Sequence, residues 1–289
     1  MPRHSESVES VRRYYDALGE QEWERLTKNV RGRVSLELHR CFLRRFVRPG
    51  WRVLEVGAGP GRFTFELAAI GCRIVVTDVS EVQLALNETR MAGTDAERRV
   101  ERRDLLDVGD ASRYANGEFD AVVAFGGPLS YAFERTDEAM RGLLRIVRPD
   151  GIVAASVMST LGTWRLFLPA ITVLSEVVGE DANDRALRTG DLRHVVDDPG
   201  GHICRMFRWS EIEALVERTG GRILDGSASN WASLGDAASL SRLESDADRW
   251  SRFIEHEAAA CGQPGARDGG THILFAAQQG VVSTASAAV

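Results

Sequence analysis

Residues 55–63 of this 289-residue chain read Glu-Val-Gly-Ala-Gly-Pro-Gly-Arg-Phe. The mostly apolar run at 51–56 predicts a short strand that runs into this stretch, and residues 61–70 predict a helix that leaves it. Glycines at such a junction let the backbone turn sharply and approach a ligand, and the N–H groups at the start of the helix are available to bind one. The stretch therefore predicts a strand, a ligand-binding turn and a helix, which together open an α/β domain.

The same alternation of strands and helices continues as far as Met158. The further strands are predicted at 73–78, 98–103, 119–125 and 152–158, and the helices at 80–92 and 136–147. Residues 119–125 form an apolar run, which is typical of a strand buried on both faces. The sequence therefore predicts an α/β, Rossmann-like sheet that is mostly parallel and has helices on both faces.

After Met158 the pattern changes before it resumes. An apolar, helical segment is predicted at 161–178, followed by a polar stretch at 179–201. The later elements are predicted as a strand at 204–207, a helix capped by Ser210, a strand near 222–224, one helix carrying Leu240 to Ile254, and a last strand at 271–277. The inserted part is too long for an ordinary connection, and such insertions usually serve a function.

Two residues narrow the class of ligand that the glycine turn can bind. The dinucleotide fingerprint GxGxxG requires glycine at position 62, where this chain has arginine. Asp78 ends the second predicted strand, 17 residues after Gly61, where a carboxylate can accept hydrogen bonds from both hydroxyls of a ribose. A ribose-containing ligand other than a nicotinamide dinucleotide is therefore favoured.

The region from Trp51 to about Met158 resembles the class I S-adenosylmethionine-dependent methyltransferases. The motif Glu-x-Gly-x-Gly-x-Gly carries the resemblance, together with the acids after the second and third strands and Pro149-Asp150-Gly151 before the fifth. The resemblance implies S-adenosylmethionine as cofactor and a seven-stranded sheet whose last strand is antiparallel. The cofactor-binding positions that it implies are Glu55, Gly57, Ala58, Gly59, Gly61, Asp78, Val79, Asp104, Leu105, Phe125 and Gly126.

The resemblance also assigns a role to several of these positions. The glycine loop would wrap the amino-acid part of the cofactor, and Asp78 would hold the ribose with Val79 beside the adenine. Asp104 would reach the adenine amino group, with the nearby Asp107 as the alternative. The backbone of Gly126 would face the methionine ammonium group.

The chain divides into three parts on this interpretation. Residues 1–48 form N-terminal helices, which act as a lid in methyltransferases of similar layout, residues 49–278 form the catalytic domain, and residues 279–289 form a flexible tail. Residues 159–203 form a substrate cap inserted in the domain. Aromatic side chains of these parts are candidates for an apolar substrate chamber, although the same residues could instead pack against the sheet. They are Tyr15, Trp23, Tyr131, Trp164 and Phe167.

His202 and Tyr131 are the candidates for catalysis. His202 lies near the end of the cap, and imidazole has a pKa that suits a general base, although a loop histidine facing water is the alternative. Tyr131 follows the fourth strand, where it could touch a substrate. We expect His39 on a solvated helix face and His272 in a structural role far from the site. No His, Asp or Glu grouping and no cysteine pair has metal-ligand spacing, so no metal is predicted.

The residues after the fourth strand bear on the substrate. Methyltransferases that act on base amines or glutamine amides usually carry Asn/Asp-Pro-Pro-Tyr there, whereas residues 126–131 read Gly-Gly-Pro-Leu-Ser-Tyr. The net charge of -6 also disfavours a nucleic-acid partner. We therefore expect methyl transfer to an O, N or S atom of a small, aromatic or hydrophobic metabolite. The alternatives are an RNA methyltransferase that uses the arginine-rich helix 40–48, and a cofactor-binding regulator or silent partner subunit.

Composition bears on the compartment. The chain is 44% apolar and 27% charged, as expected for a globular domain, and Lys28 is its only lysine. We expect no apolar run long enough to span a bilayer and no signal peptide in the polar N-terminal residues. The sequence therefore predicts a cytoplasmic protein without a membrane partner, and it leaves the oligomeric state open.

Overall fold

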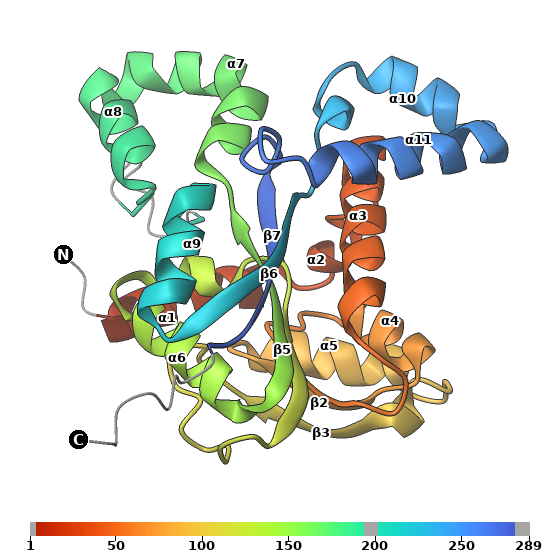
Figure 1. Ribbon diagram of the computed structural model, residues 1–289. Helices are drawn as coiled ribbons and strands as arrows, with labels where there is room; N and C mark the ends of the chain where they lie inside the picture. The colour runs from red at the N-terminus through yellow and green to blue at the C-terminus, as the bar shows by residue number, and fades with distance from the viewer. Residues whose placement is uncertain (1–3, 194–201, 281–289) are drawn as a thin grey trace, which may run out of the picture.

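The computed structural model describes residues 4–193 and 202–280, and a seven-stranded sheet forms the centre of this part of the chain (Figure 1). The strands are β1 (Arg52–Val56), β2 (Arg73–Asp78), β3 (Val100–Leu105), β4 (Phe119–Ala124), β5 (Val147–Met158), β6 (Gly221–Ala228) and β7 (His272–Gln279). Their order in the sheet is β3-β2-β1-β4-β5-β7-β6. Strands β1 to β5 pair in parallel, and β7 runs antiparallel to both of its neighbours. The predicted Rossmann-like sheet with an antiparallel last strand is confirmed.

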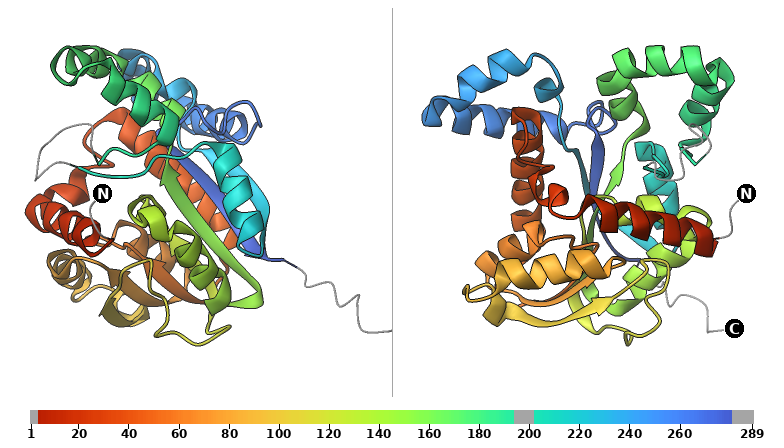
Figure 2. Two further views of the ribbon diagram at one scale, coloured as in Figure 1. Left: turned by 90° about the vertical axis from the view of Figure 1, so that its left-hand side faces the viewer. Right: turned by 180° about the vertical axis from the view of Figure 1, so that it is seen from behind.

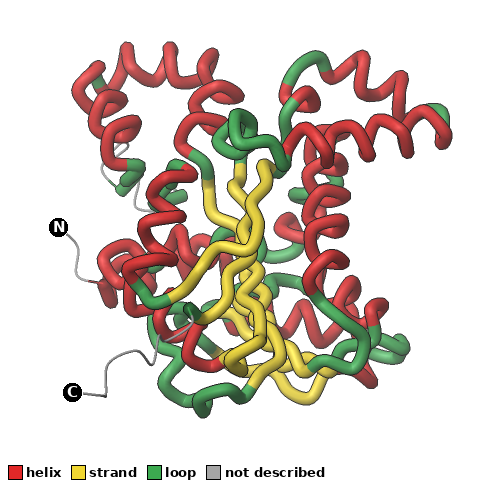
Figure 3. Tube along the Cα trace, viewed as in Figure 1, coloured by secondary structure: helices red, strands yellow, loops and turns green. Residues whose placement is uncertain are grey.

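Helices surround the sheet in the described residues (Figure 3). They are α1 (His4–Leu18), α2 (Gln21–Glu24), α3 (Val30–Phe46), α4 (Arg62–Ile70), α5 (Glu81–Met91), α6 (Thr136–Ile146), α7 (Thr160–Val178), α8 (Glu180–Thr189), α9 (Trp209–Arg218), α10 (Ala237–Glu244) and α11 (Ala247–Cys261). Short 3₁₀ helices include η2 (Pro128–Tyr131), which directly follows the turn after β4.

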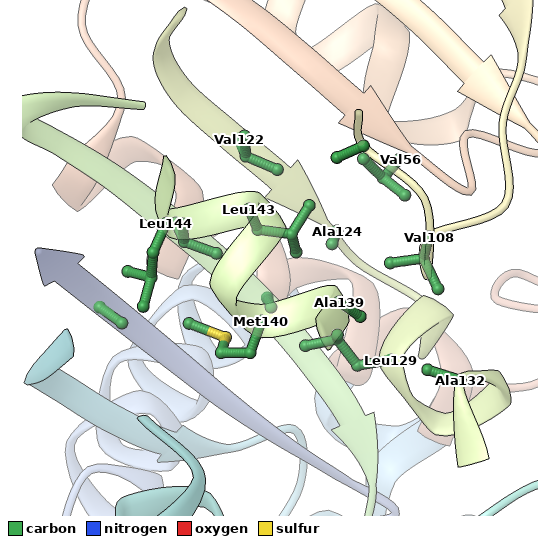
Figure 4. Packing of buried hydrophobic residues seen from close by; sticks show 14 of the residues in the cluster. Val56, Val108, Val122, Ala124, Leu129, Ala132, Ala139, Met140, Leu143 and Leu144 are labelled. Carbon is green, nitrogen blue, oxygen red and sulfur yellow. The ribbon is translucent and has the colours of Figure 1, made fainter. Parts of the chain in front are cut away.

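The central strands are buried on both faces because successive side chains point to opposite sides of the sheet. Val53 of β1 packs in the cluster that includes residues of α3, α4 and α5, whereas its neighbour Leu54 packs in the cluster that includes residues of α6 and α9. Figure 4 shows Leu143 of α6 close to Val122 and Ala124 of β4. The resulting two-sided core explains why β4 is apolar almost throughout.

Several predicted boundaries are confirmed, and others are wrong for identifiable reasons. Ser80 caps α5 as predicted, since its side chain accepts a hydrogen bond from the Gln83 N–H. The single helix predicted around residues 240–254 is two helices, because the Asp246 side chain accepts two backbone N–H groups and starts α11. The polar stretch at 179–201 contains α8, with 194–201 outside the described residues. The predicted strand at 204–207 makes only isolated bridges.

Two helical arms extend from the carboxyl edge of the sheet, α7–α8 after β5 and α10–α11 after β6 (Figure 1). Helix α7 is exposed along much of its length, and Val177 is 80% exposed. Its 19 residues, with a window of mean hydropathy 1.3, make it long and apolar enough to cross a membrane. The prediction that the chain has no such run is therefore wrong, although length and composition alone are a weak indication of a membrane span.

The predicted N-terminal part divides between two locations. Helices α1 and α2 lie on the same side of the molecule as α5, and α1 contacts α5 and η2 (Figure 2). Helix α3 packs on the sheet instead, through Leu36, Phe42 and Leu43. The predicted tail at 279–289 lies outside the described residues except for Gln279 and Gly280.

Candidate active site

The turn after β1 has backbone conformations that favour glycine. The φ angles are +67° at Gly57, +54° at Gly59 and +101° at Gly61. A Cβ atom at position 57 would lie 2.6 Å from Cγ of Pro128, and one at position 61 would lie 2.8 Å from Cε of Met91. Gly57 and Gly61 are therefore needed for close packing as well as for the turn.

A pocket lies at this turn, at the carboxyl ends of β2, β1 and β4. Because β1 lies between β2 and β4, residues that follow β2 line one end of the pocket and residues that follow β4 line the other. This is the place where an open α/β sheet binds ligands. Predicted cofactor residues that line the pocket are Gly57, Ala58, Gly59, Asp78, Val79, Phe125 and Gly126. Residues of the wall that were not predicted include Pro60, Arg62, Phe63, Leu106, Val108 and Pro128.

Asp78 is held firmly in the wall of the pocket. Its Oδ2 accepts the backbone N–H of Gly59 at 2.8 Å, and its Oδ1 accepts the backbone N–H of Ser80 at 2.9 Å. Burial raises the pKa of Asp78 to about 6, against the opposing effect of the backbone hydrogen bonds from Ser80 and Gly59. The carboxylate is therefore fixed in direction and becomes neutral in mildly acidic conditions.

Glu55 lies beneath the turn and does not line the pocket. It is 2% exposed, and its Oε2 accepts a hydrogen bond from the Thr64 hydroxyl at 2.7 Å. The other oxygen, Oε1, is buried and has no hydrogen-bond partner among the described residues. Burial raises the pKa of Glu55 to about 8. Instead of forming the wall as expected, Glu55 supports the start of α4 from inside the protein.

The predicted pair after the third strand is also displaced from the pocket. Asp104 binds the Arg102 guanidinium at 2.7 Å, and Leu105 is 45% exposed. Strand β3 runs two residues further than predicted, to Leu105, and the Leu106 N–H then bonds the Asp78 carbonyl at 2.9 Å. This connection brings residues 106–108 into the pocket wall, so that Asp107, the alternative to Asp104, lines the pocket.

Side chains of the first two helices and the loop after them cover the pocket. Tyr15, Glu22 and Arg25 line it, and Arg25 Nε bonds the Glu22 carboxylate at 2.8 Å. With these side chains in place the free volume is about 90 Å³, below the about 300–1,000 Å³ of most ligand pockets. The segment consisting of α1, α2 and Arg25, which we call the lid, therefore covers part of the pocket and leaves it little free volume.

The sequence predicts that Trp23 touches the substrate, but Trp23 lines neither this pocket nor the cavity between α7 and α8. The guanidinium groups of Arg62 and Arg90 both pack over its ring, 3.7 Å and 4.4 Å from the ring centroid. The Arg62 side chain also donates to the Trp23 carbonyl. Trp23 therefore anchors the lid on α4 and α5.

The two predicted catalytic residues are in contact with each other. The Tyr131 hydroxyl is 2.8 Å from Nε2 of His202 and 2.5 Å from the Tyr15 hydroxyl. The Tyr14 ring packs 5.0 Å from the His202 ring. His202 is an exposed residue, yet nearby protein atoms desolvate the imidazole, and this desolvation, with the charge of Arg25, lowers the pKa of His202 to about 4. His202 is therefore a neutral ring at physiological pH.

A second cavity, of about 470 Å³, lies between α7 and α8. Trp164 and Phe167 line it, as does His202. Tyr131 lines the first pocket, so its hydrogen bond to His202 connects the walls of the two cavities.

His39 and His272 lie closer to the pocket than predicted. His39 is 2% exposed because helical spacing places it on the same face as Leu36 and Leu43. Its Nδ1 donates to the Ser35 carbonyl at 2.7 Å, which leaves Nε2 to accept from the Ser156 hydroxyl at 3.2 Å. The Ser156 oxygen in turn accepts the Gly126 N–H at 2.9 Å, so this series of buried hydrogen bonds fixes the turn after β4.

His272 lies next to these hydrogen-bonded residues, and the centroids of the His272 and His39 rings are 6.1 Å apart. Its Nε2 is buried without a hydrogen-bond partner among the described residues. Burial is the main cause that keeps the pKa of His272 well below its ordinary value. Within the described residues, no three His, Cys, Asp or Glu side chains gather as a metal site would require.

Comparison with known proteins agrees with this architecture. Residues 53–151 match the family model described as a methyltransferase domain. The chain contains a methyltransferase domain of class I. The matched residues run from β1 to Gly151 within β5, so the domain model covers the pocket from the glycine turn to Tyr131 but not the lid or the α7–α8 arm.

Relatives of the methyltransferase domain share only part of their length with it. The demethylmenaquinone methyltransferase of Beutenbergia cavernae is 36% identical over 119 residues, which are 39% of this chain and 43% of that protein. The enzyme of the same name from Clavibacter sepedonicus is 33% identical over 131 residues, 43% of this chain and 49% of that protein. The chain thus spans about half the length of the curated relatives it matches, or less.

Solved structures share the fold over more of the chain. A S-adenosylmethionine-dependent methyltransferase from Mesorhizobium loti matches with a TM-score of 0.55 at 15% identity, over 82% of this chain and 95% of that one. The [4+2]-cyclase SpnF matches with a TM-score of 0.53 at 20% identity, over 85% of this chain and 81% of that one. At these identities the likeness concerns the fold alone.

Proposed function

We propose that this methyltransferase domain transfers a methyl group from S-adenosylmethionine to an O, N or S atom of a small, apolar metabolite. The observation that carries the proposal is Asp78, which lines an apolar pocket next to the glycine turn and is held by the Gly59 and Ser80 amides. A carboxylate in this position suits the two hydroxyls of a ribose.

The other walls of the pocket suit the remaining parts of the cofactor. Val79, Leu106 and Val108 offer apolar surface to the adenine at the β2 end. Towards β4, the turn from Gly57 to Gly59 presents backbone without side chains, as the methionine part requires. The opposite charges of Glu22 and Arg25 complement its ammonium and carboxylate groups.

The lid must open for the cofactor to enter, because the closed pocket has a free volume of only about 90 Å³. We propose that α1 and α2 move outward during entry and then cover the bound reactants. Covering them excludes water and holds both reactants in line, which supplies much of the rate in a displacement reaction. S-adenosylmethionine itself supplies a methyl group that is already activated by a sulfonium centre.

A small acceptor is favoured over RNA by the pairing of the arginines of α3. Arg40 and Arg44 both bind Glu66, and Arg45 binds Asp225. Arginines neutralised in this way have little net charge to offer a phosphate backbone. The relatives described above are named for demethylmenaquinone, which is also a small-molecule acceptor. We propose Tyr131 and His202 as catalytic residues, with Tyr15, Trp164 and Phe167 in contact with the acceptor.

The test is incubation of the purified chain with methyl-labelled S-adenosylmethionine and a metabolite extract. We expect label in a small molecule and none in RNA from the same cells. Cofactor binding without transfer to any component would overturn the proposed activity and would favour a regulator, a silent partner subunit or another chemistry on this fold. Transfer to RNA would overturn the proposed acceptor class.

A further inference from the structure

Three polar side chains are linked by hydrogen bonds from one cavity to the other. The Tyr15 and Tyr131 hydroxyls are 2.5 Å apart, and the Tyr131 hydroxyl is 2.8 Å from Nε2 of His202. Tyr15 and Tyr131 line the pocket at the glycine turn, whereas His202 lines the α7–α8 cavity. These residues come from α1, η2 and the segment before α9, so only the fold brings them together.

The α7–α8 cavity has the size and lining of a site for an organic molecule. Its volume of about 470 Å³ falls within the range of about 300–1,000 Å³ that is usual for such sites. Trp164, Phe167, Ile171 and Leu174 of α7 face Ala186 and Leu187 of α8 across it. His202 is the one titratable side chain in this wall within the described residues. A ligand would therefore place its apolar part among the helices and direct its polar group past His202, towards the pocket at the glycine turn.

The order of the strands places this cavity next to the proposed cofactor pocket. The pocket extends over β2, β1 and β4, and α7 follows β5, which is the next strand in the sheet. Tyr131 follows β4 and lies at the boundary between the two. Tyr131 and His202, which are hydrogen-bonded to each other, thus lie between the α7–α8 cavity and the pocket.

We propose that the α7–α8 cavity binds the apolar body of an aromatic acceptor that carries a hydroxyl group, and that Tyr15, Tyr131 and His202 conduct the hydroxyl proton away. This inference rests on the proposed methyl transfer and names its acceptor class. A hydroxyl needs such a route because its oxygen is a weak nucleophile until the proton leaves, whereas a thiolate does not need one.

The reaction balances along this chain. The acceptor oxygen forms a bond to the methyl carbon while the carbon–sulfur bond breaks, and its electron pair goes to the sulfur. The acceptor proton passes to the Tyr15 oxygen, the Tyr15 proton to Tyr131, and the Tyr131 proton to Nε2 of His202. For Nε2 to accept this proton, His202 must start as the tautomer that carries its own proton on Nδ1. Because the surrounding protein and Arg25 disfavour the charged ring, His202 then releases a proton to water at its accessible side.

The cavity is tested with 4-phenylphenol, whose biphenyl body is apolar and whose hydroxyl carries the proton. Calorimetry is done on protein saturated with S-adenosylhomocysteine, after its binding has been measured separately. Ala186→Phe fills the cavity, and we expect it to weaken the binding of 4-phenylphenol at least about tenfold. Trp164→Ala, at a residue 42% exposed, removes a wall with little risk to folding and should weaken it as well. Arg188→Phe, on the exposed side of α8, is the matched control and should not.

The proton route is tested by comparing methyl transfer to 4-phenylphenol and to biphenyl-4-thiol. Tyr131→Phe breaks the chain, so we expect transfer to the phenol to fall about 100-fold while transfer to the thiol, measured at a pH where it is ionised, is nearly unchanged. An equal loss with both acceptors would mean a merely structural role and would overturn the route.

Three other results would overturn the acceptor class. They are no 4-phenylphenol binding, equal binding by Ala186→Phe and wild type, or binding of 4-phenylphenol without its methylation by protein that does methylate another component of the metabolite extract. A failure of S-adenosylhomocysteine to bind the wild type would instead overturn the proposed function, so the two failures are distinguishable.

Discussion

The Asp78 carboxylate accepts the backbone N–H of Gly59 at 2.8 Å, which ties the acid at the end of β2 to the glycine turn after β1. The two features that the sequence separates by 19 positions are therefore parts of one rigid wall. A ligand that binds one of them must meet the other. We therefore expect the protonation state of this carboxylate to control ligand binding in the pocket.

Cofactor binding should depend on pH through Asp78. Its pKa is raised to about 6, and Glu22 of the lid contributes to this through its charge. Ribose hydroxyls donate to the ionised carboxylate, so affinity for S-adenosylhomocysteine should be full above about pH 7 and fall up to about tenfold per pH unit below pH 6. Calorimetry from about pH 5 to pH 8 measures this, and Asp78→Asn should flatten the profile. An equally steep profile in Asp78→Asn would assign the effect to another group.

Glu55 should make folding less favourable as pH rises. Its pKa is about 8 in the folded protein against an ordinary 4.5, so the folded state holds the proton more tightly than the unfolded state. The free energy of unfolding should therefore decrease between about pH 4.5 and pH 8, by a few kcal/mol, and Glu55→Gln should lack this decrease. Urea denaturation across this range measures the difference between the two proteins. A constant difference at every pH would contradict the assignment.

Gly57 and Gly50 provide a matched pair for the glycine turn. Both have positive φ, +67° and +81°, so an alanine at either position should cost about 1–2 kcal/mol in backbone strain. At position 57 the new Cβ would also displace Pro128, whereas at position 50 it would meet nothing within 4 Å. Calorimetric unfolding should show that both variants are destabilised, while only Gly57→Ala loses affinity for S-adenosylhomocysteine. Equal affinity in both would contradict the role of the turn.

Trp23 should hold the lid closed without touching the acceptor. Its contacts with Arg62 and Arg90 are each worth about 0.5–2 kcal/mol, so Trp23→Ala should free α1 and α2. Hydrogen exchange read by mass spectrometry should then be faster in peptides from residues 4–24, and S-adenosylhomocysteine should restore part of the protection. Exchange that is unchanged in Trp23→Ala would mean that other contacts close the lid.

The parts that could be predicted from the sequence are those with a local cause. The glycine turn, the strand that ends at Asp78 and the Ser80 cap each depend on a few adjacent residues, and the structure has them where they were expected. The third strand shows where this reasoning ends. A register shift in the pairing of β2 with β3 and a strand two residues longer than predicted move Asp104 out of the pocket and Asp107 into it.

Contacts between distant segments could not be predicted in the same way. Tyr131 and His202 are 71 positions apart, and the residues around each of them in the sequence do not indicate that the two side chains touch. Trp23 was expected in the substrate chamber because it is aromatic, yet the arginines that hold it lie on α4 and α5. His39 could have been placed correctly, since helical spacing aligns it with Leu36 and Leu43.

The central claim is that the pocket at the glycine turn binds an S-adenosyl cofactor through Asp78. The most direct measurement is calorimetric titration of S-adenosylhomocysteine into the wild type, Asp78→Ala and Asp104→Ala at neutral pH. We expect saturable binding by the wild type, a loss of at least about tenfold in Asp78→Ala, equivalent to one charge-assisted hydrogen bond, and little change in Asp104→Ala. No binding by the wild type, or a loss in Asp104→Ala as large as that in Asp78→Ala, would contradict the account.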